Sequence, residues 1–242
     1  MNPTPYPFDD FLRAKHRLLR ALFEHHEPFA LLTGDTGTGK TALLRELRTT
    51  IERPRYRLVY FAQARKLGAV GLIKVIGESL RVRPSLCHAL GLERLLRALA
   101  EDPRTLLLWL DEAHELPEET LAEARALTES DLAGTGPIQV RLIGLPKLRA
   151  QLQAQPALWR RIPVREEITG LRFEELNAFL EHHFPAPQRL CEQGLAALFE
   201  RAKGVPGLLL PMYRAILEHA SSDSAPIDPV QVEDTLERWD LA

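Results

Sequence analysis

Residues 34–41 read Gly-Asp-Thr-Gly-Thr-Gly-Lys-Thr, which matches the pattern Gly-x-x-x-x-Gly-Lys followed by Ser or Thr. The run Phe-Ala-Leu-Leu at residues 29–32 precedes it and is typical of a buried strand, and leucines recur at helical spacing from residue 43 onward. A strand, a glycine-rich loop and a helix in this order predict a phosphate-binding loop. The backbone N–H groups of such a loop curl around the β-phosphate at the positive end of the helix.

The loop therefore predicts a site for ATP, with Mg²⁺ as the metal cofactor. Lys40 would reach the β- and γ-phosphates, and Thr41 would ligate Mg²⁺. A glycine-rich turn that binds no nucleotide is the alternative interpretation. The residues of this stretch predicted to contact the nucleotide are Gly34, Asp35, Thr36, Gly37, Thr38, Gly39, Lys40 and Thr41.

A second stretch, Leu-Leu-Leu-Trp-Leu-Asp-Glu at residues 106–112, predicts an apolar strand that delivers two carboxylates at its C-terminal end. Asp111 would orient the Mg²⁺ shell, and Glu112 would polarise the water that attacks the γ-phosphate. The alternative is that both carboxylates only cap the helical stretch after them. His114 is either hydrogen-bonded locally or involved in sensing the phosphate.

Short apolar runs alternate with amphipathic helical patterns up to about residue 168, which predicts an α/β fold with a parallel sheet flanked by helices. After Arg172 the pattern is helical only, so we expect an α/β core at residues 1–170 and a small helical lid at residues 171–242. The predicted strands are residues 29–32, 58–62, 105–110, 140–143 and 164–168. The predicted helices are residues 9–24, 41–51, 70–80, 90–100, 118–130, 173–183, 188–202, 208–220 and 229–239.

The composition is that of a globular protein. The chain has 242 residues, of which 45% are hydrophobic and 26% charged, so disordered and fibrous classes are excluded. Two cysteines are too few for a disulfide framework, and the apolar run at residues 106–110 is too short to cross a bilayer. The first residues carry no basic segment followed by an apolar one, so we expect a cytoplasmic protein without a membrane partner.

The charges are distributed unevenly. Residues 1–100 contain 17 Lys/Arg and 9 Asp/Glu, a net of +8, whereas residues 101–242 contain 14 and 24, a net of −10. Between residues 45 and 83 there are ten Lys/Arg and three acids. This basic segment indicates phosphate-led DNA binding, assembly of a basic face against an acidic face of a second copy, or a solvated helix surface. The first two interpretations can coexist.

Residues 111–114 spell Asp-Glu-Ala-His, the signature of a helicase superfamily, but such helicases need two motor domains and the chain has room for one. The sequence instead resembles the AAA+ ATPases, and within them the group that includes the secretion-associated ExeA proteins and the transposition regulators MuB, TnsC and TniB. The stretches that carry the resemblance are LLTGDTGTGKTALLREL at 31–47, LLLWLDEAHELPEETLAEARAL at 106–127, VRLIGLPKLRAQLQAQPALWRRI at 140–162 and RAKGVPG at 201–207.

This resemblance implies a P-loop NTPase fold, a homo-oligomeric ring or filament, and ATP bound at subunit junctions. It implies that Arg160 or Arg161 reaches the nucleotide of a neighbouring subunit, although both arginines also suit an ordinary surface. It also places residues 63–68 toward a central pore, so Arg65, Lys66 and Lys74 are candidate contacts to double-stranded DNA. Few aromatic residues lie among the basic ones, so binding would be sequence-tolerant and salt-sensitive.

The function that the resemblance favours is an ATP-dependent DNA-binding regulator of DNA transposition, which selects target DNA, recruits a transposase and disassembles on hydrolysis. Alternatives are an ExeA-like ATPase of a secretion or envelope-assembly system, and a signalling NTPase that acts on a protein partner. Two departures lower the expected hydrolysis rate. Gly207 stands where the lid motif usually has arginine, and the stretch 143–145 is Ile-Gly-Leu where a polar sensor is common.

Overall fold

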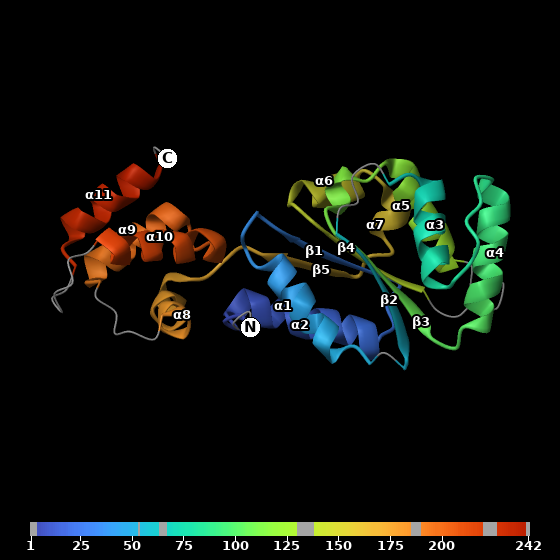
Figure 1. The fold of residues 1–242 in the computed structure, drawn as a ribbon, viewed down its shortest axis with the longest axis horizontal. Coiled ribbons are helices and arrows are strands. Elements are labelled where there is room, and N and C mark those ends of the chain that lie inside the picture. Colours follow the sequence, from blue (N-terminus) through green and yellow to red (C-terminus); the bar gives the residue numbers. More distant parts are fainter. Residues whose placement is uncertain are drawn as a thin grey trace. The chain divides into compact units, whose positions relative to one another are not determined.

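The computed structural model describes residues 4–52, 54–62, 67–129, 138–184, 190–219 and 227–240. Its central feature is a five-stranded sheet with the strand order β2-β3-β4-β1-β5 (Figure 1). Strand β3 runs parallel to both β2 and β4, and β4 runs parallel to β1, so the predicted α/β fold with a parallel sheet is confirmed. The strands are β1 (Phe29–Gly34), β2 (Tyr56–Phe61), β3 (Thr105–Leu110), β4 (Ile138–Gly144) and β5 (Val164–Ile168).

Helices cover both faces of this sheet. Figure 1 shows α1 and α2 on one face, where the ammonium of Lys15 and the carboxylate of Glu46 form an ion pair between the two helices. Helices α5 and α6 lie on the other face. The helices of this part are α1 (Asp9–Phe23), α2 (Lys40–Thr50), α3 (Ala69–Ser79), α4 (His88–Glu101), α5 (Glu118–Glu129), α6 (Lys147–Gln153) and α7 (Pro156–Trp159), with the 3₁₀ turn η1 (Ala113–Glu115) after β3.

The sheet is apolar because it is buried on both sides. Every residue of β1 and β4 is buried, as are the last five residues of β3, which explains the continuous hydrophobic runs seen in the sequence. Two polar side chains inside β4 are satisfied locally. The guanidinium of Arg141 donates to the side-chain oxygen of Gln139 (2.6 Å) and to the carbonyl of Glu27 (3.1 Å), and the Gln139 amide donates to the carbonyl of Leu22 (3.3 Å).

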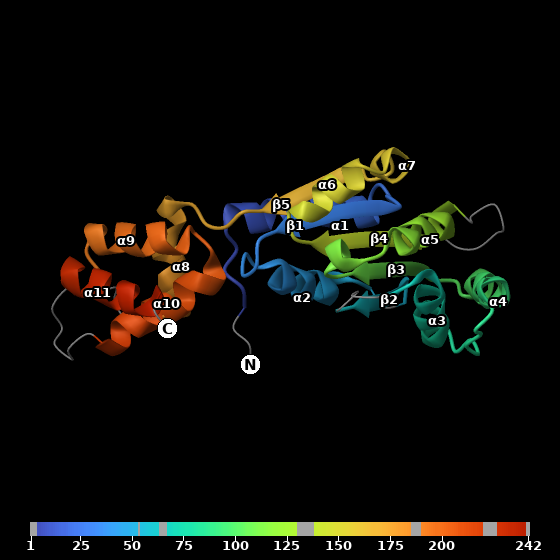
Figure 2. The ribbon, with the colours of Figure 1, turned by 90° about the horizontal axis from the view of Figure 1, so that it is seen from above.

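The chain after β5 is helical, and its last three helices pack against one another (Figure 2). It contains the 3₁₀ turn η3 (Phe173–Glu175), α8 (Leu176–His183), α9 (Glu192–Ala202), α10 (Pro206–His219) and α11 (Pro229–Asp240). The helix expected at 173–183 is divided because the Glu175 carboxylate accepts the backbone N–H of Arg172, which closes a separate turn (2.8 Å). The sequence also missed α6 and α7, whose short lengths leave no periodic pattern.

The described chain forms two compact units. One contains residues 15–34 and 45–167, and the other contains residues 1–14, 35–44 and 168–242, so the glycine-rich loop belongs with the C-terminal helices. The division at residue 168 falls close to the predicted boundary between residues 170 and 171. The assignment of residues 1–170 to a core and 171–242 to a lid stays a prediction. In the described part of the chain, no helix is both long and apolar enough to cross a bilayer.

Candidate functional site

The glycine-rich loop connects β1 to α2 and curls back on itself. Gly37 and Gly39 adopt φ angles of +85° and +105°, which lie in the left-handed region that glycine tolerates. The backbone N–H and the hydroxyl of Thr38 both donate to the carbonyl of Asp35, at 3.3 and 2.9 Å. The loop therefore has the curled backbone that presents successive N–H groups to an anion.

Lys40 is the first residue of α2 and is buried, with 8% of its surface exposed. Its ammonium donates to the carbonyl of Asp35 at 2.8 Å, so the cation lies against the loop rather than in solvent. Thr41 follows it and is exposed. A lysine at this position, next to the positive end of a helix, suits a bound phosphate.

The first turn of α10 touches this loop, and both segments belong to the same compact unit. The backbone N–H of Gly207 donates to the carbonyl of Gly37 at 3.0 Å. A Cβ atom on Gly207 would lie 2.8 Å from the Cα atom of Gly37, which is too close for any side chain. The structure thus gives a reason for the missing lid arginine, because the backbone approach leaves room only for glycine at position 207.

Asp111 follows β3 directly, is buried, and is oriented by two donors. Its Oδ2 accepts the hydroxyl of Tyr60 on β2 at 2.8 Å, and its Oδ1 accepts the backbone N–H of Glu112 at 2.9 Å. Each carboxylate oxygen keeps a second lone pair, so Asp111 fits its predicted role in a Mg²⁺ shell. Burial and the hydrogen bond to Asp111 raise the pKa of Tyr60 to about 12.

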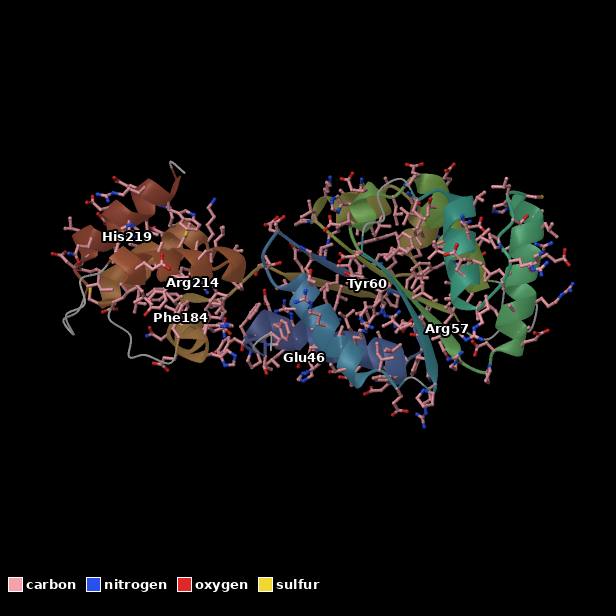
Figure 3. All side chains as sticks on the ribbon, in the orientation of Figure 1. Glu46, Arg57, Tyr60, Phe184, Arg214 and His219 are labelled. Atoms are coloured by element: carbon pink, nitrogen blue, oxygen red, sulfur yellow. The ribbon has the colours of Figure 1, made fainter. Side chains whose placement is uncertain are left out.

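Tyr60 is a residue that the sequence analysis missed (Figure 3). It lies opposite Trp109 in the β2–β3 register, one position before the end of its strand. Parallel strands of one sheet end at a common edge, so the last residues of β2 were candidates to reach Asp111. The sequence did not show that β2 pairs with β3.

Glu112 has a left-handed backbone, with φ 54° and ψ 34°, which is uncommon outside glycine. Such conformations cost about 1–3 kcal/mol and cluster at functional sites. The Glu112 side chain makes no capping hydrogen bond to η1, so the structure shows no capping role for Glu112 at this turn. Within the sheet, β1 and β3 flank β4, and both run to the same edge. Asp111 and Glu112 leave the sheet at the edge where β1 ends.

The two candidate arginines of the neighbour contact, Arg160 and Arg161, follow α7 and are exposed. The guanidinium of Arg161 forms an ion pair with Glu129 of its own chain at 3.0 Å. Within the described ranges, Arg160 has no carboxylate partner. The preceding Trp159 is covered by the Arg165 guanidinium, 3.7 Å from its ring centre, which fixes the end of this segment.

Of the three predicted DNA contacts, Lys74 lies on α3 and is exposed. Arg65 and Lys66 lie outside the described residues. The arrangement of all three along one nucleic-acid surface therefore stays a prediction.

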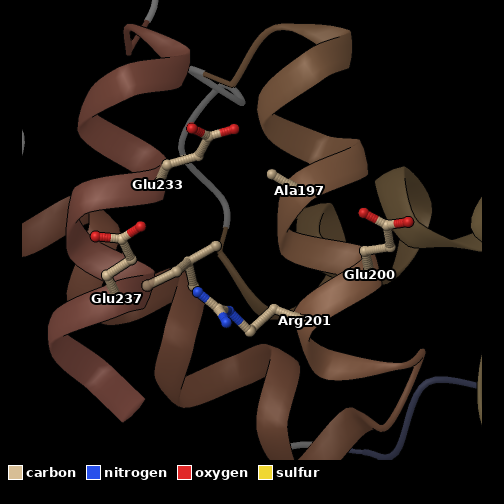
Figure 4. A pocket seen from close by; sticks show the side chains of 6 residues that line it. Ala197, Glu200, Arg201, Glu233 and Glu237 are labelled. Atoms are coloured by element: carbon tan, nitrogen blue, oxygen red, sulfur yellow. The ribbon is translucent and has the colours of Figure 1, made fainter. Parts of the chain in front are cut away.

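A separate hollow of about 350 Å³ lies between α9 and α11. Figure 4 shows that carboxylates and one guanidinium surround it; its lining residues are Ala197, Glu200, Arg201, Glu233, Leu236 and Glu237. Three carboxylates against one arginine disfavour a phosphate there. This hollow is not a second candidate for nucleotide.

The sequence profile of a family described as AAA domain matches residues 23–152. The general secretion pathway protein A of Aeromonas hydrophila is 31% identical over an alignment of 165 residues, and the match covers 63% of this chain and 29% of that protein. The chain thus spans less than a third of the length of this relative.

Solved structures of three other proteins share the fold. Cdc6p of Pyrobaculum aerophilum superposes with a TM-score of 0.74 at 20% identity, covering 98% of this chain and 69% of that one. The Aeropyrum pernix ORC1 protein in complex with DNA gives 0.64 at 19%, covering 97% and 65%. A RuvB variant of Thermotoga maritima gives 0.59 at 15%, covering 100% and 75%. At these identities the likeness concerns the fold alone.

Proposed function

Because the chain belongs to the AAA domain family, we propose that it binds ATP with Mg²⁺ and hydrolyses it. One observation carries this proposal: a curled glycine-rich loop follows β1, and two carboxylates, of which Asp111 is oriented by two donors, follow β3; these two strands end at the same edge of the sheet. Ligands of open α/β sheets bind outside the carboxyl ends of the strands.

Each residue has a role that its own surroundings support. The amides of the loop and the Lys40 ammonium bind the β- and γ-phosphates. Thr41 and Asp111 would hold Mg²⁺, which neutralises phosphate charge when bound. Asp111 is oriented by the two donors that face it, and Glu112 accepts a proton from the attacking water.

We propose that hydrolysis is completed between subunits by Arg160. Its guanidinium is exposed, whereas that of Arg161 is engaged with Glu129 of its own chain. A planar guanidinium suits the charge that develops on γ-phosphate oxygens. ATP would then favour a head-to-tail ring or filament, because the γ-phosphate supplies the charge that the neighbour binds.

For the partner, we propose double-stranded DNA and a role as a transposition regulator that recruits a transposase. The basic segment at residues 45–83 and the exposed Lys74 support phosphate-led binding. The relation to general secretion pathway protein A supports a second candidate, an ATPase of a secretion system.

The first experiment measures phosphate release by the purified chain with ATP, with and without EDTA. Glu112→Gln should bind ATP normally but lose at least 100-fold in turnover, and Lys40→Ala should lose nucleotide binding. Equal turnover by wild type and Glu112→Gln contradicts the assigned site.

The second experiment mixes the chain with random-sequence duplex DNA and a non-hydrolysable ATP analogue, and follows retardation and electron micrographs. ATP-dependent binding should weaken by about 10³-fold or more between 50 and 200 mM salt if six or more phosphates are contacted. Lys74→Ala should reduce the salt slope by about 1, whereas Arg97→Ala, an exposed arginine on α4, serves as the control. Absence of binding at low salt rejects the DNA proposal and favours the secretion candidate.

A further inference from the structure

His114 lies in the η1 turn, two residues after Glu112, and only 4% of its side chain is exposed. The neighbouring Glu112 carboxylate is half-exposed, with 46% of its side chain accessible. The proposed ATPase mechanism assigns no role to His114, but its contacts indicate a role in hydrolysis.

The imidazole is held by the end of β4. The backbone N–H of Leu145 donates to Nδ1 of His114 at 3.3 Å. An imidazole nitrogen that accepts a hydrogen bond carries no proton, so the ring proton of the neutral form is on Nε2. That nitrogen lies 3.4 Å from Oε2 of Glu112 and 3.4 Å from Oε1 of Glu115. The ring therefore places an N–H group at equal distance from the proposed hydrolytic carboxylate of Glu112 and from Glu115, and Glu115 already pairs with the Lys147 ammonium at 3.1 Å.

The ring also depends on the glycine that ends β4. A Cβ atom on Gly144 would lie 3.0 Å from Nδ1 of His114 and 3.1 Å from the side chain of Leu148. The absence of a side chain there makes the space for the imidazole. Although the stretch Ile143-Gly144-Leu145 has no polar side chain, His114 supplies a polar group at the end of this strand.

The η1 turn is tied to α6 by two more hydrogen bonds. The side-chain amide of Gln151 donates to the carbonyl of His114 at 3.2 Å, and the Lys147 ammonium donates to Glu115 at 3.1 Å. The position of the imidazole therefore depends on both β4 and α6, because hydrogen bonds connect the η1 turn to both elements. The chain continues from α6 into α7 and Arg160.

We infer that His114 is a positioning residue that orients the Glu112 carboxylate through its Nε2–H group, with Leu145 fixing the tautomer. This inference rests on the proposed hydrolysis by Glu112. A glutamate side chain has three rotatable bonds, and a carboxylate held at one orientation loses less freedom when it aligns water. Removing this donor should lower turnover without changing ATP affinity.

Two amide variants separate positioning from a purely structural role. The amide nitrogen of glutamine reaches the place of the histidine Nε2, whereas the shorter asparagine reaches only the place of Nδ1. His114→Gln should retain turnover within about threefold, because it keeps a donor toward Glu112. His114→Asn should keep the contact to Leu145 but lose about 10- to 100-fold in kcat, with an unchanged Kd for ATP.

The reverse order, with asparagine active and glutamine inactive, overturns the inference and assigns His114 to the Leu145 contact. An equal loss of turnover in both variants also overturns the inference, as does a loss confined to ATP affinity. Melting temperatures within a few degrees of wild type show that both variants fold. In the Glu112→Gln background, His114→Asn should have no further effect on single-turnover hydrolysis, and an additive effect contradicts coupling between the two residues.

A spectroscopic readout separates this inference from the proposed function. In ¹⁵N spectra of histidine-labelled protein, the neutral form of His114 should carry its proton on Nε2, and Glu112→Ala should shift the Nε2 resonance. If wild type hydrolyses no ATP but this shift is seen, the proposed function fails and the contact stands. If the Nε2 chemical shift does not change in Glu112→Ala, the contact between His114 and Glu112 is refuted.

Discussion

Gly207→Ala tests the backbone contact between α10 and the glycine-rich loop. The added Cβ would lie 2.8 Å from the Cα atom and 3.1 Å from the carbonyl oxygen of Gly37, and neither backbone atom can rotate away. Overpacking of this kind costs about 1–3 kcal/mol, and weakening the hydrogen bond from Gly207 costs about 1 kcal/mol. A helical alanine regains about 1 kcal/mol over glycine, so the net destabilisation should be about 1–3 kcal/mol.

The matched control is Gly194→Ala on α9 in the same compact unit. A Cβ on Gly194 would meet its nearest atoms at 3.4–3.7 Å, which is ordinary contact, so the same chemical change should stabilise the protein by about 0.5–1 kcal/mol. The two variants therefore have opposite expected signs.

Scanning calorimetry measures both. At roughly 2–4 °C per kcal/mol for a chain of this size, Gly207→Ala should lower the melting temperature by about 2–12 °C, and Gly194→Ala should raise it by about 1–4 °C. Amide exchange at residues 204–209 should accelerate in the first variant only. A melting temperature that rises in Gly207→Ala as it does in the control refutes the close approach and, with it, the explanation for the missing arginine.

Three further predictions follow from the described contacts. The alkaline difference absorbance at 295 nm between wild type and Tyr60→Phe should show one tyrosine that ionises near pH 12. Because this folded pKa lies above the unfolded value of 10, the stability that Tyr60 contributes is present below pH 10 and is lost as the pH rises toward 12. A tyrosine that ionises near pH 10 contradicts the hydrogen bond to Asp111. Arg160→Ala should lower ATP turnover at least tenfold at high protein concentration while leaving the melting temperature unchanged. Arg161→Ala should change the free energy of unfolding by less than about 1 kcal/mol, because its pair with Glu129 is exposed. Equal turnover in both variants rejects Arg160 as the residue that contacts the neighbour's nucleotide. Leu108→Ala, at a fully buried position of β3, should lower the free energy of unfolding by about 2–5 kcal/mol in urea titration, and a loss below 1 kcal/mol is incompatible with the packing around β3.

Local patterns accounted for most of the fold. The strand at 105–110 and the strand at 164–168 were predicted with the bounds that the structure has. The first contains an apolar run, which stands out in the sequence because a strand inside a parallel sheet is buried on both faces, whereas the second reads Val-Arg-Glu-Glu-Ile and is only partly buried. Two short helices were not predicted from the sequence. Helices α6 and α7 have seven and four residues, too few for a periodic pattern. Their positions depend on packing against η1 and on the Arg165 guanidinium over Trp159.

The sequence by itself determined the glycine-rich loop and the carboxylate pair, since each is a short local motif. It also determined the alternation of strands and helices that predicts a parallel sheet, since each strand and helix has its own local pattern. The tertiary structure alone decided which side chains orient Asp111 and Glu112. Tyr60 reaches Asp111 because β2 pairs with β3, and His114 reaches Leu145 because β4 lies beside β3. The tertiary structure also explains why position 207 needs glycine, because α10 approaches the backbone of Gly37, which lies 170 residues earlier in the chain. Hydrogen bonds and steric contacts between distant segments arise only when the chain is folded, so no local pattern contains them.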